Sequence, residues 1–81
     1  MTATQHAPMT EIDRAYAKAI GLAARGGAGA VGELLAAAGA NPHVLGAVAE
    51  RLRSLVVEHP HAFAPADALA LVNEARLRAL A

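Results

Sequence analysis

Apolar residues recur along this chain at intervals of three and four positions, which is the spacing of an α-helix rather than a strand. In the first run, Ile12, Tyr16, Ile20 and Ala23 share one face, and Lys18 falls outside it. No segment shows the alternation typical of a half-buried strand. The pattern predicts four helices, over residues 10–25, 28–38, 42–58 and 65–80.

Residues that favour helix ends mark these boundaries. Thr10 followed by Asp13 matches a capping box, in which the two side chains and backbones bond reciprocally. Gly26-Gly27 stops the first helix, because glycine readily adopts the conformation that follows a helix. Asn41 as N-cap, with Pro42 at the first helical position, gives the clearest boundary in the chain.

The last helix is expected to begin at a proline. Pro60 ends the preceding helix, because the residue before a proline avoids the α conformation. Pro65 suits the first position of a new helix and places Asp67 in its first turn, where a negative charge is favourable. Glu74 and Arg78 are four residues apart, so we expect them to form an ion pair.

The helix over 42–58 carries the most regular stripe, formed by Leu45, Val48, Leu52 and Leu55. We expect it to be the centre of the bundle. The helices before and after it should be its antiparallel neighbours, because short turns join them. Val57 lies on the far side of this helix and is expected to be exposed.

The last helix has more apolar positions than one face requires. Leu69 and Val72 suit one side, whereas Leu71, Leu77 and Leu80 spread around the cylinder. Such a helix is either central in the bundle or packs on something outside its own domain. These five residues therefore form the expected partner interface.

Together these elements predict an all-α fold, a small bundle of four helices joined by short turns. Residues 1–9 are polar and lack periodicity, so we expect a disordered leader followed by a single helical domain over residues 10–81. Met1 and Met9 both stand as candidates for the functional start.

Alanine sets the character of the predicted core. Hydrophobic residues make up 56% of the 81 positions, but more than a quarter of the chain is alanine, and Tyr16 and Phe63 are the only aromatics. Alanine favours helices yet buries little area. A bundle of this kind therefore gains by burying further surface against a second copy or another protein.

The charge balance limits the partners. Seven basic residues match seven acidic ones, which removes long-range attraction to nucleic acid or to anionic membranes and favours self-association. The absence of cysteine excludes disulfides and thiol chemistry. Without a recognisable signal peptide or a long apolar run, we expect a cytoplasmic protein that does not bind membranes.

The histidines are the first candidates for chemistry. His59 and His61 flank the rigid Pro60, beside Glu58 and with His43 elsewhere, so they could supply metal ligands. A structural metal site needs about four ligands, and no helix face carries a matching pair. We expect a solvated loop, with no metal and no cofactor, although the sequence leaves binding by His59 and His61 open.

Catalysis has little support in this sequence. Ser54, the only serine, lies mid-helix among charged residues rather than beside a base. The glycine-rich segment 26–32 lacks the Gly-Lys-Ser/Thr of a phosphate loop and follows no strand, so a flexible turn is the better interpretation. We expect no enzyme activity and no catalytic or cofactor-binding residues.

The segment from Glu33 to Leu52 resembles the helix-turn-helix unit of bacterial repressors, with apolar Leu34, a turn glycine, Asn41 and apolar Val48 in the expected order. The resemblance implies DNA binding through the second helix. That helix, however, opens with residues that offer little to base edges.

We therefore expect a non-catalytic protein–protein interaction or self-association module, an adaptor or a small subunit of a larger assembly. Its partner would be itself, as a homodimer or higher oligomer, or another protein, with no nucleic acid. The alternative is a small helix-turn-helix DNA-binding regulator. The sequence leaves the identity of the partner, the pathway and the stoichiometry open.

Overall fold

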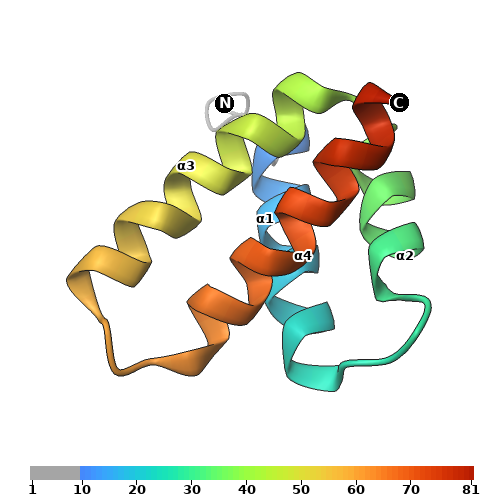
Figure 1. Cartoon of the computed structure of the whole chain (residues 1–81). Coiled ribbons are helices and arrows are strands. Elements are labelled where there is room, and N and C mark those ends of the chain that lie inside the picture. The colour runs from blue at the N-terminus through green and yellow to red at the C-terminus, as the bar shows by residue number, and fades with distance from the viewer. Residues whose placement is uncertain (1–9) are drawn as a thin grey trace, which may run out of the picture.

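A computed structural model of the chain describes residues 10–81. They form four helices: α1 (Glu11–Arg25), α2 (Ala30–Ala37), α3 (Pro42–Glu58) and α4 (Phe63–Leu80). The predicted all-α bundle of four helices is confirmed (Figure 1), and no strand occurs in this part of the chain. The predicted leader, residues 1–9, lies outside the described residues.

The predicted boundaries of α1 are confirmed. The Thr10 hydroxyl accepts a hydrogen bond from the Asp13 backbone N–H (3.1 Å), and the Asp13 carboxylate accepts one from the Thr10 N–H (3.4 Å). At the other end, Gly26 has a φ of 71°, a left-handed conformation that glycine adopts without steric cost. The chain therefore leaves α1 where the sequence predicts.

The turn from α2 to α3 uses both a left-handed ending and a side-chain cap. The Ala40 N–H donates to the Leu35 carbonyl (2.9 Å) and the Gly39 N–H to the Ala36 carbonyl (3.0 Å), the two bonds of a Schellman motif. Ala40 has a φ of 54°, unusual for a residue with a Cβ. The Asn41 side chain then caps α3, as predicted.

The start of α4 differs from the prediction. The helix begins at Phe63, so Pro65 is its third residue rather than its first, and Asp67 lies beyond the first turn. A proline is tolerated there because the first four N–H groups of a helix have no intrahelical partner. Lengthening a helix that has already formed adds backbone bonds at little cost, and this outweighs the preference of Ala64 against the α conformation before a proline.

The central helix is α4, not α3. Figure 1 shows α4 in front, with α3 on one side, α2 on the other and α1 behind, and α4 packs against all three. The expected packing of α3 against α4 is confirmed, but α2 and α3 do not pack against each other, so the expectation that α3 is the centre with both as neighbours is wrong. Like α4, α1 packs against all three other helices, but α4 makes the more extensive contacts. The left-handed residues Gly39 and Ala40 redirect the chain between α2 and α3, so sequence adjacency does not produce packing here.

Half of the buried core is alanine, and no polar or charged side chain is buried in the described part of the chain. Leucine and valine supply the rest, including the fully buried Leu52, whereas Leu55 is only half-buried and Val57 is 75% exposed. The buried residues come from all four helices: Ala15, Ala19, Leu22, Ala30, Leu34, Ala38, Val44, Leu45, Val48, Ala49, Leu52, Ala68, Val72 and Ala75.

A surface contact joins α1 to α3. The Arg51 guanidinium lies 2.9 Å from the Asp13 carboxylate and stacks over the Tyr16 ring, 5.1 Å from its centroid. The hydrogen bond from Arg51, followed by those from Thr10, lowers the pKa of Asp13 below its ordinary value. Asp13 therefore acts twice, as a cap residue of α1 and as the partner of Arg51.

Truncating the buried leucine of α3 should be far more costly than truncating the exposed valine. Replacing Leu52 by alanine leaves a cavity that neighbouring alanines cannot fill, so we expect Leu52→Ala to lower the free energy of unfolding by about 2–5 kcal/mol. Val57→Ala should lower it by less than about 1 kcal/mol. Denaturant melts at one fixed protein concentration compare the two, and equal losses would contradict this packing of α3.

The Asp13 contacts should make stability depend on pH in the acid range. Because the folded-state pKa of Asp13 is lowered, its contribution is present above the unfolded-state pKa and is lost as pH falls through the folded-state pKa. The stability difference between wild type and Asp13→Asn should therefore be largest at neutral pH and shrink in acid. Melts between neutral and strongly acidic pH measure it, with Glu11→Gln as the control, and a difference independent of pH would refute the effect.

Candidate functional site

The solvent-facing side of α4 carries a regularly spaced row of exposed, mostly apolar residues. Six of its residues, spaced alternately three and four apart, are all exposed, and we call them the outer stripe: Phe63, Ala66, Ala70, Asn73, Leu77 and Leu80. Phe63 is 83% exposed, Leu77 66% and Leu80 62%. This spacing is that of a coiled-coil seam, in which such positions meet a second helix.

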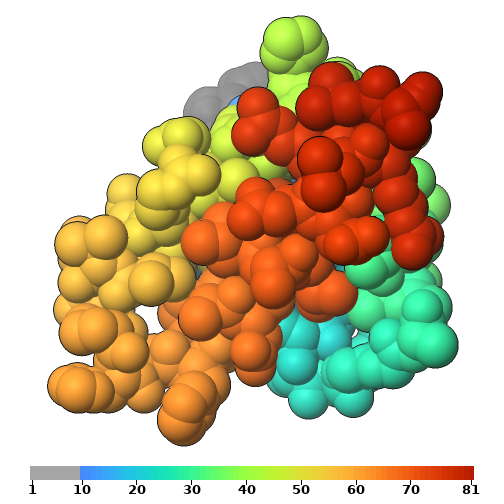
Figure 2. Space-filling view, in the orientation of Figure 1, coloured from blue at the N-terminus to red at the C-terminus, as the bar shows by residue number. Residues whose placement is uncertain are grey.

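The outer stripe is accessible because α4 stands forward of the other helices. Figure 2 shows α4, from orange to red, running across the front of the molecule. The opposite side of α4 is turned into the core through Ala68, Val72 and Ala75. The helix is therefore apolar on two opposite sides, one facing the bundle and one facing solvent.

The structure separates the five residues that the sequence grouped as a partner interface. Val72 is fully buried, so it supports the core and cannot contact a partner in this conformation. Leu69 and Leu71 are half-buried against the core. Leu77 and Leu80 are exposed and belong to the outer stripe.

Sequence reasoning missed the first four members of the outer stripe. Starting the helix at Pro65 placed Phe63 in a loop and hid the regular interval between Phe63, Ala66 and Ala70. The spacing itself is visible in the sequence, so a helix extended by two residues would have revealed it.

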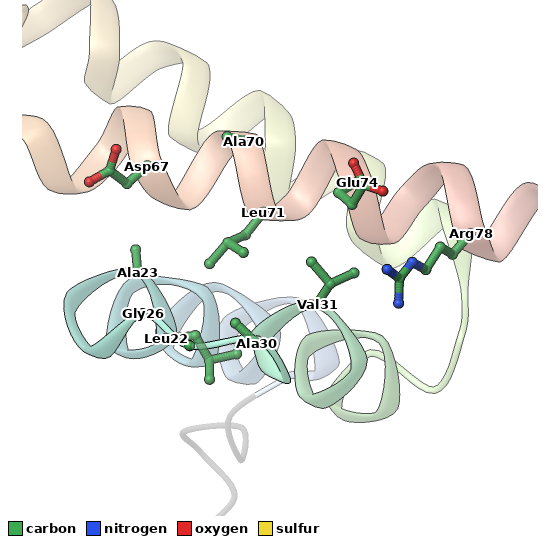
Figure 3. Close-up of a pocket in the computed structure, with 11 residues that line it drawn as sticks. Leu22, Ala23, Gly26, Ala30, Val31, Asp67, Ala70, Leu71, Glu74 and Arg78 are labelled. Carbon is green, nitrogen blue, oxygen red and sulfur yellow. The ribbon is translucent and has the colours of Figure 1, made fainter.

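A groove runs beside the outer stripe, between α4 and the segment that joins α1 to α2. It is open to solvent and has a volume of about 550 Å³. In Figure 3, Leu71 from α4 and Val31 from α2 point into it from opposite walls, and the Arg78 side chain also reaches into it. The backbone of Gly26-Gly27 completes the wall near the end of α1. The glycine-rich segment thus forms part of this surface hollow.

Three charged residues of α4 lie along this groove: Asp67, Glu74 and Arg78. None of them takes part in an ion pair within residues 10–81, so the predicted pair between Glu74 and Arg78 does not form. On the other flank of α4, the Arg76 guanidinium lies over Gly46 of α3. The two flanks of the outer stripe therefore differ, with acidic residues on the groove side and Arg76 on the α3 side.

The histidine turn and the only serine form no visible site. His43, His59 and His61 are exposed, and among residues 10–81 no three histidine or acidic side chains gather as metal ligands would. Ser54 is exposed on α3. No helix within residues 10–81 has the length and hydropathy that crossing a bilayer requires.

The segment resembling a helix-turn-helix has a different arrangement in space. Its two helices, α2 and α3, do not pack on each other. The two arginines of α3 are already engaged, Arg51 with Asp13 and Arg53 with Glu50. Little unpaired positive charge is left on this part of α3 to face a phosphate backbone.

Comparison with known protein families, with curated proteins and with solved structures gives no match to this chain.

The protein should not bind duplex DNA at physiological salt. Phosphate contacts dominate such binding, and this chain has no net charge and pairs its α3 arginines internally. A gel-shift titration into the micromolar range should show no complex. A shift at micromolar protein that weakens steeply with added salt would contradict this expectation and favour the DNA-binding alternative.

Proposed function

We propose that this chain is a non-catalytic self-association module, in which the outer stripe of α4 packs against the same stripe of a second copy. The observation that carries the proposal is the regular spacing of the six exposed residues of the outer stripe, alternately three and four apart. Three of them, Phe63, Leu77 and Leu80, are large apolar residues that are mostly open to solvent. A small protein gains from covering such a patch, and a second copy supplies a stripe of the same length.

The expected free energy of pairing is moderate. Fully burying one large apolar side chain contributes about 1.5–3 kcal/mol, and a twofold dimer buries Phe63, Leu77 and Leu80 twice. Association opposes this with a cost of about 4–15 kcal/mol for lost translational and rotational freedom. A micromolar dissociation constant corresponds to a net binding free energy of about 8 kcal/mol. Burial of these side chains supplies that surplus when the association cost lies in the lower part of its range.

Composition and charge agree with this role. The alanine-rich core offers little burial within one copy, and a chain with equal numbers of basic and acidic residues meets no net electrostatic repulsion from its own copy. We place the module in the cytoplasm, because a chain without cysteine needs no oxidising compartment to fold.

A charge in the outer stripe should dissociate the dimer. Leu77→Glu brings two carboxylates into an apolar seam, where desolvation and mutual repulsion oppose pairing, so we expect a monomer by light scattering. Wild type should show double the monomer mass at micromolar concentration.

Val57→Glu is the matched control, since Val57 is an apolar residue of α3 that is at least as exposed as Leu77 and lies outside the outer stripe. It should leave the dimer intact, and circular dichroism should show that both variants remain folded. A wild-type monomer at high concentration, or equal dissociation by both variants, would overturn the proposal.

A further inference from the structure

The outer stripe has an internal order of side-chain sizes that bears on how two copies meet. Its residues run from large Phe63 through small Ala66 and Ala70 and polar Asn73 to large Leu77 and Leu80. Two helices keep a constant separation only if each facing layer has a similar total volume, because the axial distance follows the side chains in contact. The direction of the second helix therefore decides whether the seam packs evenly.

We infer that the two α4 helices pair antiparallel, with Ala66 opposite the partner's Leu77. This inference rests on the self-association proposed above and specifies its geometry. In that register, Phe63 faces the partner's Leu80 and Ala70 faces the partner's Asn73, so small side chains at the centre meet larger ones. Both directions place large side chains together at the two ends of the seam. Parallel pairing, however, would stack alanine on alanine in two adjacent central layers and leave gaps in the middle of the seam.

The antiparallel direction brings the charged residues of the two groove sides together in one attractive and one repulsive contact, so side-chain size rather than charge carries the inference. In an antiparallel twofold pair, the same flank of both helices meets across the seam, so the groove sides face each other. Along the helix axis, Asp67 is then offset from the partner's Arg78 by only two residues, or about 3 Å. Neither residue has an ion-pair partner within the described chain, so both are available to pair.

One unfavourable contact accompanies this pair and makes the geometry testable. The same register brings Asp67 about equally close to the partner's Glu74, a like-charge contact. In parallel pairing, Glu74 would instead lie beside the α3 flank of the second copy, which carries Arg76. The sign of the effect of a charge change at Glu74 therefore depends on the direction of pairing.

Cysteine cross-linking tests the register directly, because the natural chain contains no cysteine. We would prepare A66C, L77C and an equal mixture of the two in a glutathione redox buffer, and identify disulfides by mass spectrometry. In the antiparallel register, two Ala66 positions lie eleven residues apart along the axis, about 16 Å. Cα atoms more than about 7 Å apart cannot be bridged, so only the mixture should yield a dimer, joining position 66 to position 77.

The outcomes separate the register from the self-association itself. A disulfide between two copies of A66C would show parallel pairing and overturn this inference while leaving the dimer in place. A wild-type dimer sensitive to Leu77→Glu but with no disulfide in any sample would also overturn the register. A wild-type monomer by light scattering would overturn the proposed function together with the inference.

Glu74→Lys gives a second readout without cysteine. It replaces the like-charge contact to the partner's Asp67 by an opposite-charge one, twice per dimer, so the dissociation constant should fall several-fold at low salt and the gain should fade as salt is added. A weaker dimer would instead indicate parallel pairing beside Arg76 and overturn the inference. Glu50→Lys, a change of equal charge on α3, is the control and should not reproduce the tightening.

Discussion

The bundle depends on the close packing that small side chains allow around α4. A single helix contacts all three others only if its inner side admits them, and α4 offers Ala68, Val72 and Ala75 there, each fully buried. On α1 the facing core is likewise built from Ala15 and Ala19. Because each alanine buries little area, these core positions contribute less transfer free energy than leucine would.

This arrangement explains why the surface of α4 remains apolar. The inner side of the helix is occupied by the other three helices, yet leucine and phenylalanine continue around to the solvent side, where nothing in the described chain covers them. A helix between other helices needs apolar residues over a wide arc, but only part of that arc faces the core here. The exposed remainder is regular in spacing, and a regular pattern is more informative than scattered exposed leucines, which most protein surfaces carry.

Local signals in the sequence predicted the local structure well, because capping depends on a few neighbouring residues. Thr10 with Asp13, and Asn41 with Pro42, specify helix starts through contacts within one turn. The arrangement of the helices was harder to predict. The regular stripe of α3 suggested a central helix, yet the weakly patterned α4 takes that place. Apolar residues on its solvent side as well as on its inner side remove the amphipathic contrast that makes a stripe visible.

The candidate site was predicted only in part, because periodicity identifies apolar positions but not the side of the helix that faces the core. Leu77 and Leu80 were recognised as surplus apolar residues, whereas Val72 was wrongly grouped with them because periodicity alone does not say which of two apolar sides faces the core. Phe63 was assigned to a loop because Pro65 was placed at the first position of the helix. The first position is only a preference for proline, and the helix begins two residues earlier, with Pro65 as its third residue.

The fully buried alanines have a consequence for how this fold can vary. A leucine in the core can be exchanged for methionine or isoleucine with modest repacking, but at Ala15, Ala19, Ala68 and Ala75 any larger residue would push two helices apart. Substitution should therefore be freer at the large core positions than at the small ones. In a set of diverging sequences with this architecture, the lasting signature would be where alanine recurs, and a search pattern built on those positions would recognise distant relatives better than one built on leucine.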